Sequence, residues 1–199
     1  MEPRNPMDIP YQEIHMLRRN LDGVPRFPLP AGFTLRHHRP GDRKTWLRIH
    51  HACYDAEGRI AITPELFDEQ FGTDPKEFAR RQLFLCDPAG NAVGTITAWK
   101  KTGDDGRVRG QIHWVAILPS HRGRGLAKPM LAAAMNLLHD LGHDCAWLGT
   151  QTVRLPAIRL YLAFGFLPDR RNPEEAEAWA RLREILALPR SPISGNRKT

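Results

Sequence analysis

The sequence has little that would place it in a membrane or in an oxidising compartment. No apolar run approaches the roughly 20 residues that a helix needs to span a bilayer. The N-terminus, MEPRNPMDIPYQEIH, lacks the apolar core of a secretory signal. Only three cysteines occur, Cys53, Cys86 and Cys145, and they are far apart and odd in number. We therefore expect a cytoplasmic protein with reduced thiols and no membrane contact.

Several signatures of known catalytic classes are also missing. The chain has no Gly-Lys-Ser/Thr phosphate loop, no Gly-x-Ser-x-Gly of serine hydrolases and no His-Glu-x-x-His of zinc proteases. His139 and His143 stand four residues apart, but no third metal ligand is near them in the sequence. The helix dipole favours cations at the C-terminal end of a helix, which is a sufficient explanation for this pair of histidines. We expect no metal site.

The charge of the chain is basic, with a formal net charge of +7. A basic chain invites a nucleic-acid hypothesis. Its Lys and Arg residues are scattered, however, and no recognised nucleic-acid motif or basic run interleaved with aromatics occurs. We favour a solvated surface that also attracts an anionic ligand, and we expect no nucleic-acid partner.

One stretch, residues 111–141, organises the rest of the chain. Its apolar run at 114–118 predicts a buried strand, which Pro119 ends. From Leu126 onward the apolar residues recur with the helical period, and Gly142 follows the last of them. Pro129 is tolerated only in the first turn of a helix. The pattern therefore predicts a helix that begins near residues 124–126.

A loop with two glycines and two arginines joins this strand to this helix. The first N–H groups of a helix have no internal partner and attract anions. Glycines also let the backbone approach a ligand closely. A dinucleotide fingerprint would need a small residue where Lys128 stands. The loop predicts a pyrophosphate held by main-chain amides.

Two ordered motifs give these features a family. Residues 122–127, RGRGLA, match the Arg/Gln-x-x-Gly-x-Gly/Ala loop that binds acetyl-coenzyme A in the GNAT superfamily of N-acetyltransferases. Residues 156–166, PAIRLYLAFGF, resemble that family's Asn-x-x-Ala-x-x-Leu-Tyr-x-x-x-Gly-Phe segment, with Arg154 in the asparagine position. The chain thus resembles a GNAT enzyme over about residues 109–168, and more weakly from about residue 32.

The resemblance implies an α/β GNAT fold: a mixed, mostly antiparallel central sheet with one splayed pair of strands, flanked by helices. We expect an N-terminal arm at residues 1–31, with a short helix within 11–21, a GNAT domain at 32–188 and a mobile tail at 189–199. Start signals at Thr63 and Asn172 predict two helices, and turn residues at 87–91 predict a hairpin.

The resemblance also suggests two catalytic residues. Tyr161 falls at the family's general-acid position, where a phenol of pKa about 10 can serve the leaving thiolate. His113 falls where arylalkylamine-type members keep a histidine base, and Gln111 where histone-type members keep a glutamate. Alternation along the strand would place one set of residues on one face and a second set on the other: Gln111, His113, Val115 and Ile117 against Ile112, Trp114, Ala116 and Leu118. A tyrosine and a histidine that merely pack in the core remain the alternatives.

The expected co-substrate is acetyl-coenzyme A, with the Val115 N–H polarising its thioester carbonyl and a primary amine of a small molecule, amino acid or peptide attacking directly. A non-catalytic, coenzyme A-binding regulatory or partner-binding module is the alternative. The acceptor, the acyl length and the oligomeric state stay open, including a homodimer. The expected cofactor-binding residues are Val115, Ala116, Ile117, Arg122, Gly123, Arg124, Gly125, Leu126, Ala127, Lys128, Arg154 and Ala157.

Overall fold

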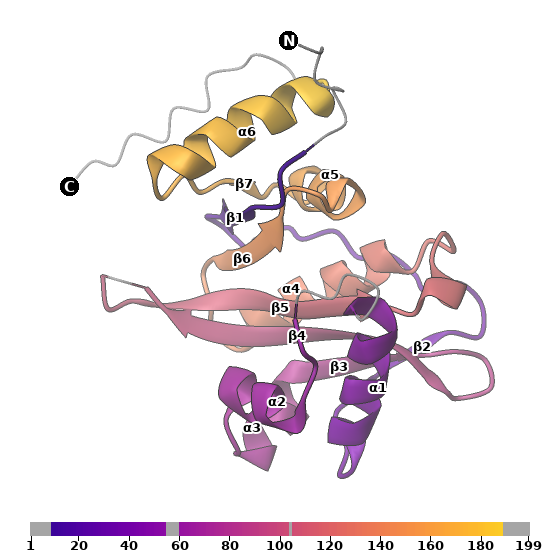
Figure 1. Ribbon diagram of the computed structural model, residues 1–199. Helices are drawn as coiled ribbons and strands as arrows, with labels where there is room; N and C mark the ends of the chain where they lie inside the picture. Colours follow the sequence, from indigo (N-terminus) through magenta and orange to yellow (C-terminus); the bar gives the residue numbers. More distant parts are fainter. Residues whose placement is uncertain (1–8, 55–59, 104, 189–199) are drawn as a thin grey trace. The chain divides into compact units, whose positions relative to one another are not determined.

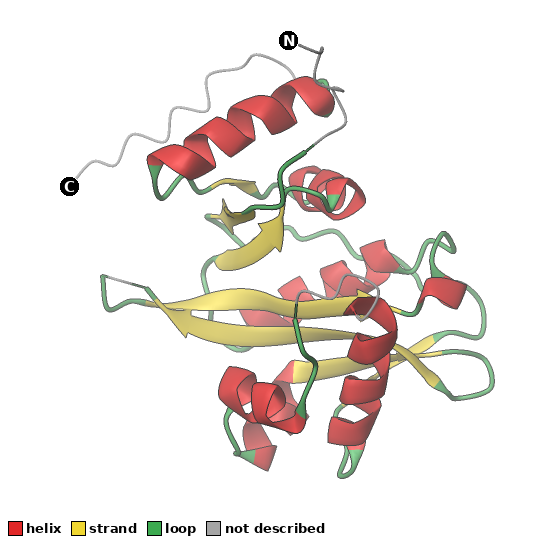
Figure 2. Cartoon of the chain, in the orientation of Figure 1, coloured by secondary structure: helices red, strands yellow, loops and turns green. Residues whose placement is uncertain are grey.

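The computed structural model describes residues 9–54, 60–103 and 105–188, which divide into two compact units (Figure 1). The larger unit is Asn20–Ala146, and the smaller one combines the segment up to Arg19 with the chain from Trp147 onward. Both units contain helices and strands, as Figure 2 shows. The predicted tail at 189–199 lies outside the described residues, and the predicted domain of residues 32–188 stays a prediction.

The larger unit contains an antiparallel sheet with the strand order β2-β3-β4-β5. The turn at Asp87 confirms the predicted hairpin, because its Oδ1 accepts the N–H groups of Ala89 at 3.0 Å and Asn91 at 2.8 Å. The β5 strand overlaps the predicted central strand at residues 114–117. The bounds are β2 Thr34–His37, β3 Gln82–Cys86, β4 Ala92–Thr102 and β5 Val108–Ile117.

Three helices of the larger unit precede β3, and one of them begins after Thr63, as the sequence predicts. The Leu66 N–H donates to Thr63 Oγ1 at 3.1 Å, which caps one helix. The Lys76 N–H donates to Asp74 Oδ1 at 2.9 Å, which caps the next. A proline at the first position follows each cap. The helices are α1 Asp42–Tyr54, α2 Pro64–Phe71 and α3 Pro75–Arg81.

The two faces of this sheet carry different layers. Phe84 on β3 belongs to an apolar cluster with residues of α1, α2 and α3, among them Trp46, Phe67 and Phe78. Its neighbour Leu83 instead lines a groove with residues of α4 (Ala127–Asp140). Adjacent strand residues point to opposite faces, so α4 covers the face that α1–α3 leave free. Large buried rings and α4 together fix the sheet that positions the candidate site.

The smaller unit has the strand order β6-β1-β7, with β6 at Ala146–Gln151, β1 at Glu13–Arg18 and β7 at Leu167–Pro168. The helix predicted within residues 11–21 is wrong, because this segment supplies β1. Ile14 and Met16 are both fully buried, which is the period of a strand. Leu17 pairs with Leu167 of β7, so tertiary pairing overrides the weak helical pattern.

Two helices complete the smaller unit, α5 (Leu155–Ala163) and α6 (Pro173–Ile185). Asn172 caps α6 as predicted, since its Oδ1 accepts the Glu175 N–H at 2.8 Å. The predicted splayed strand pair would join strands of different units and stays a prediction. No helix in the described ranges is both long and apolar enough to cross a membrane.

Candidate active site

A β-bulge interrupts the central strand β5 at the candidate base. Thr95 of β4 lies opposite Ala116, whereas Thr97 lies opposite His113. Two residues of β5, Trp114 and Val115, therefore face the single residue between the two threonines. A bulge of this kind re-aims backbone and side chains next to it.

The bulge also breaks the predicted alternation of side chains along β5. The His113 ring lies 5.4 Å from the ring of Phe71 on α2, and the Trp114 ring lies 5.1 Å from that of Trp46 on α1. Adjacent residues thus contact the same helical layer. The prediction that Trp114 faces the side opposite to His113 is wrong, because the extra residue shifts the phase of the pleat.

Trp114 has a left-handed backbone conformation with φ of 48°. This conformation is uncommon for any side chain with a Cβ and is a genuine outlier for a bulky one. Such strain costs on the order of 1–3 kcal/mol and persists only where the surrounding contacts enforce it. The indole N–H of Trp114 donates to Gln70 Oε1 at 3.1 Å, which is one such contact.

His113 keeps part of its side chain open to the surface and is a neutral imidazole at pH 7. Burial lowers the pKa of His113 to about 3, and the positive charge of Lys101 contributes in the same direction. The amide nitrogen of Gln111 lies 3.1 Å from Nδ1 of His113. A neutral imidazole has a lone pair to accept a proton, but a lowered pKa makes it a weaker base than the ordinary value assumed from the sequence.

Behind the bulge, His50 of α1 and Thr95 of β4 connect to the strained backbone. Nε2 of His50 lies 3.0 Å from Thr95 Oγ1, and this hydroxyl donates to the carbonyl oxygen of Trp114 at 3.2 Å. His50 is fully buried. Burial lowers the pKa of His50 to about 3, with a smaller contribution from His113. Neither residue stands out in the sequence, because no motif or spacing there connects His50 with Thr95.

The glycine loop between β5 and α4 has the backbone that the sequence predicts. A short 3₁₀ helix, η2 (Pro119–His121), follows the strand, and then Gly123 and Gly125 both adopt φ of 74°. A Cβ at either glycine would meet no atom within 4 Å, so the positive φ and not crowding favours glycine there. The loop is exposed and open to a ligand.

The N-terminus of α4 is suited to bind an anion. The helix begins at Ala127, and no side chain among the described residues caps its first turn. Pro129 lies in that turn, as predicted. Arg122 Nε donates to the Ile117 carbonyl at 3.1 Å, and Arg124 Nη2 donates to that of Ser120 at 3.1 Å. The arginines therefore fix the loop and surround the free amides with positive charge.

The remaining predicted residues, Tyr161, Arg154 and Ala157, lie in the smaller unit. The Tyr161 side chain is buried on α5, with its ring 5.9 Å from that of Phe166. Arg154 stands at the N-cap of α5, and its Nε donates to Gln151 Oε1 at 2.5 Å. The Ala157 N–H donates to the Arg154 carbonyl at 3.0 Å. Arg154 thus joins the end of β6 to the start of α5.

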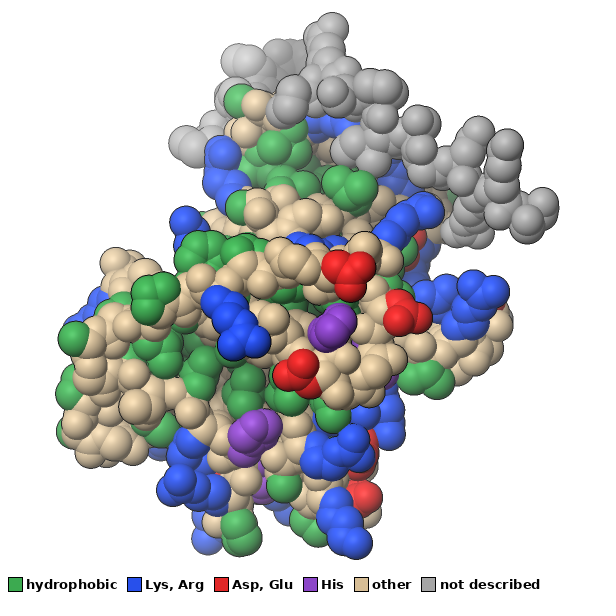
Figure 3. Space-filling view, turned by 180° about the vertical axis from the view of Figure 1, so that it is seen from behind, with side chains coloured by type: hydrophobic (Ala, Val, Ile, Leu, Met, Phe, Trp, Pro, Cys, Tyr) green, Lys and Arg blue, Asp and Glu red, His purple; other side chains and the backbone are tan. Residues whose placement is uncertain are grey.

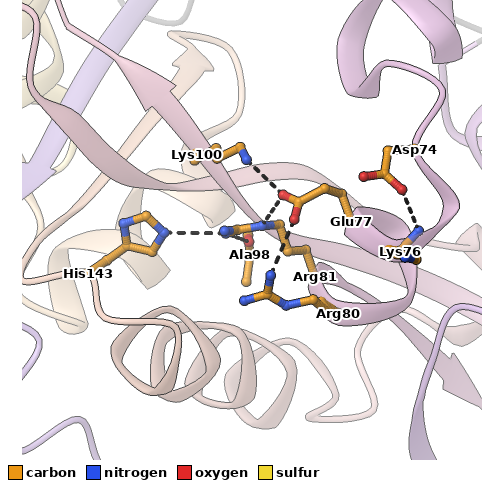
Figure 4. Close-up of polar contacts among 8 residues, drawn as sticks. All are labelled: Asp74, Lys76, Glu77, Arg80, Arg81, Ala98, Lys100 and His143. Carbon is orange, nitrogen blue, oxygen red and sulfur yellow. Dashed lines mark hydrogen bonds and ion pairs between the residues drawn. The ribbon is translucent and has the colours of Figure 1, made fainter.

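His143, one of the two histidines that stand four residues apart in the sequence, contacts Arg81. Arg81 donates to Nε2 of His143 at 3.3 Å and to the carboxylate of Glu77 at 2.9 Å, and Lys100 donates to the same carboxylate (Figure 4). A guanidinium only donates, so Nε2 of His143 accepts and the ring is neutral. Burial first, and then Arg81 and Lys100, lower the pKa of His143. No group of three metal-ligating side chains occurs among the described residues.

The surface has two further features, its charged side chains and one groove. Lys and Arg side chains occupy separate places on the face seen in Figure 3, without merging into one basic patch. An open groove of about 480 Å³ lies between α4 and strands β2 and β3. None of the predicted catalytic or cofactor-binding residues lines this groove.

The sheet, the bulge and the uncapped helix after a glycine loop define an α/β protein with an exposed, arginine-bearing loop at a helix N-terminus. Residues 44–166 match the acetyltransferase (GNAT) family. The chain belongs to this family, which confirms the predicted fold class. A GCN5-related N-acetyltransferase from Sphaerobacter thermophilus has a similar fold, with a TM-score of 0.62 and 24% identity over 80% of this chain and 50% of that one.

Curated relatives carry a more specific name. The chain is 32% identical to a mycothiol acetyltransferase of Salinispora tropica, over 80% of this chain and 54% of the relative. It is 29% identical to a mycothiol acetyltransferase of Nocardia farcinica, over 79% of this chain and 53% of the relative. The chain spans about half the length of these curated relatives.

Proposed function

We propose that the chain transfers an acetyl group from acetyl-coenzyme A to a primary amine. The observation that carries this proposal is the loop at residues 122–128, where an uncapped helix N-terminus, two glycines at positive φ and two arginines come together. Membership of the acetyltransferase family and the names of its relatives support it. The acceptor is a small molecule, an amino acid or a peptide N-terminus.

In this mechanism the loop amides and Arg122 hold the pyrophosphate of the co-substrate, which supplies an activated thioester. Backbone groups of Val115, Ala116 and Ile117 accompany its pantetheine arm. The Val115 N–H donates to the thioester carbonyl and stabilises the oxyanion that forms there. The amine attacks the carbonyl carbon, the C–S bond breaks, and the amide product and a thiolate result.

Two side chains manage the protons. His113 accepts the proton of the attacking amine, directly or through water, because its imidazole is neutral at pH 7. For Nε2 to be the accepting atom, Nδ1 must carry the ring proton, so Gln111 must present its amide oxygen to Nδ1. Tyr161 then donates its proton to the leaving thiolate. Direct attack requires neither a metal nor a covalent enzyme intermediate.

Isothermal titration with coenzyme A tests the cofactor site, and release of free thiol from acetyl-coenzyme A tests turnover with a panel of amines. We expect binding in the micromolar range and turnover with at least one amine. Absence of binding at millimolar coenzyme A would remove the proposal. Binding without turnover on any amine would favour a non-catalytic coenzyme A-binding module. Two departures from the family motifs support that alternative: Gln111 in place of glutamate and Arg154 in place of asparagine.

A further inference from the structure

The strained peptide group of the bulge is held by two side chains that come from different elements. Thr95 on β4 donates to the Trp114 carbonyl, and His50 on α1 contacts the same hydroxyl. Both side chains are buried, with 0% of each residue exposed. The contacts span 19 residues between Thr95 and Trp114 and 45 residues between His50 and Thr95. Only the tertiary fold can bring these three residues together.

The direction of these hydrogen bonds follows from their chemistry. A threonine hydroxyl has one proton, and the Trp114 carbonyl can only accept. Both contacts are therefore hydrogen bonds only if Thr95 donates to Trp114 and His50 Nε2–H donates to Thr95. This fixes the neutral tautomer of His50, with a bare Nδ1. That atom is buried and has no hydrogen-bond partner among the described residues.

The same peptide group carries the N–H that the proposed mechanism uses. The C=O of Trp114 and the N–H of Val115 belong to one peptide unit, which is planar and trans. In a trans unit these two bonds point in opposite directions. A hydroxyl that fixes the carbonyl therefore also fixes the direction of the N–H, which is aimed away from Thr95.

We propose that His50 and Thr95 form a clamp that aims the Val115 N–H at the thioester carbonyl. This inference rests on the proposed function, and it makes both residues positioning residues that act through the backbone. The hydrogen bond from the His50–Thr95 clamp is a buried contact that keeps the strained peptide group after Trp114 in one orientation. A preorganised donor of this kind needs no reorientation when the oxyanion forms.

Matched variants separate the clamp from general packing. Thr95→Val keeps the shape of the side chain and removes the hydroxyl, whereas Thr95→Ser keeps the hydroxyl. His50→Phe keeps a ring and loses the donor, whereas His50→Gln retains an N–H at the same reach. If Thr95 contributed only by packing, Thr95→Ser, which loses a buried methyl group, would lower kcat at least as much as Thr95→Val.

The first readout needs no co-substrate. In protein labelled with ¹⁵N-valine, the Val115 amide resonance is expected to shift in Thr95→Val and to stay in place in Thr95→Ser. The ¹⁵N shifts of the His50 ring are expected to show the Nε2–H tautomer. An unchanged Val115 resonance in Thr95→Val, or a His50 ring protonated at Nδ1 alone, would overturn the clamp.

The second readout follows the thioester. The carbonyl stretch of ¹³C-acetyl-coenzyme A bound to the wild type is expected at lower frequency than in solution, and Thr95→Val is expected to lose most of this shift. With an amine that the wild type acetylates, kcat falls roughly ten- to hundredfold in Thr95→Val, while KM for acetyl-coenzyme A changes less than about threefold. His50→Phe added to Thr95→Val is expected to cost nothing more, because His50 acts through Thr95.

The two proposals fail in different ways. If the wild type does not bind acetyl-coenzyme A, both the proposed function and the proposal that the Val115 N–H points at a thioester are wrong. The Val115 resonance in Thr95→Val still tests whether the clamp holds the peptide group. A Val115 resonance that shifts in Thr95→Val without any change in the bound carbonyl stretch or in kcat overturns the aiming role and leaves acetyl transfer standing.

Discussion

Two largely buried histidines, one in each unit, have pKa values that are shifted in opposite directions. In the larger unit, burial lowers the pKa of His50 to about 3, and no carboxylate among the described residues opposes this effect. In the smaller unit, burial alone would also lower the pKa of His15. Hydrogen bonds with Glu13 and Glu175 outweigh it and raise the pKa above 6.5.

The difference shows that a neighbouring carboxylate, and not burial alone, decides the direction in which the pKa of an imidazole moves. Nδ1 of His15 lies 2.8 Å from Glu175 Oε1, and the His15 N–H donates to Oε2 at 3.2 Å. This ion pair ties β1 to α6 inside the smaller unit. The larger unit instead gathers neutral rings around the bulge, which is the state required to accept a proton from an amine.

The largest expected effect concerns the acid side of the pH scale and His50. The pKa of His50 is below its unfolded value of about 6.5, so the unfolded state binds protons first as the pH falls. The stability that His50 contributes is present above pH 6.5 and is lost toward pH 3, by about 4 kcal/mol in the free energy of unfolding. Urea unfolding of the wild type and of His50→Gln at several pH values measures this.

In His50→Gln the loss between pH 6.5 and 3 should be smaller than in the wild type by about this amount. Equal pH dependence in the two proteins would mean that His50 is not neutral in the folded state, and the contrast with His15 would disappear.

The next effect compares the two candidate catalytic residues, Tyr161 in the smaller unit and His113 in the larger one. Tyr161→Phe keeps the ring that packs against Phe166 and removes the acidic proton. We expect kcat to fall about 100-fold with little change in melting temperature. His113→Gln should lower kcat less at high pH than at neutral pH, because bases in solution can then take the proton of the attacking amine. Steady-state kinetics over a range of pH distinguish them, and unchanged turnover in Tyr161→Phe would refute the acid assignment.

The charged pair of the smaller unit gives a somewhat smaller effect. Glu175→Gln keeps the shape of the side chain and removes the charge that stabilises the His15 cation. We expect the free energy of unfolding to fall by about 2 kcal/mol at pH 6. Because the pKa of His15 is raised, its contribution is present below pH 6.5 and declines as the pH rises through the folded value.

The cost of Glu175→Gln should therefore shrink by pH 9. Thermal unfolding of both proteins at pH 6 and 9 provides the measurement. A cost that is the same at both values would show that His15 is not the charged partner.

The smallest effect concerns the exposed arginines of the loop. Arg122→Gln removes one charge near the predicted pyrophosphate, so the Kd for coenzyme A should rise about three- to tenfold, more at low ionic strength. Arg107→Gln removes an equal charge from the exposed turn between β4 and β5 and serves as the control. Calorimetric titration compares them; an equal loss in both variants would indicate a general charge effect instead of a phosphate site.

Local features of the fold follow from the sequence because their causes lie within a few residues. Thr63, Asp74 and Asn172 cap helices that begin with proline, and the glycines at 123 and 125 adopt the positive φ that suits them. The two motifs identified the family, and with it the candidate residues Tyr161 and His113. The sequence itself determined where helices start, where the loop lies and which family the chain belongs to.

Only the tertiary structure decided which residues meet at the bulge. Burial of the β1 segment beside β7 replaced a plausible helix with a strand, and the extra residue in β5 changed the face of Trp114. His50, Thr95 and Trp114 are brought together by a fold that closes distances of 19 and 45 residues. The protonation state of His50 and the strain at Trp114 depend on burial and hydrogen bonds between distant residues, which no local sequence pattern predicts.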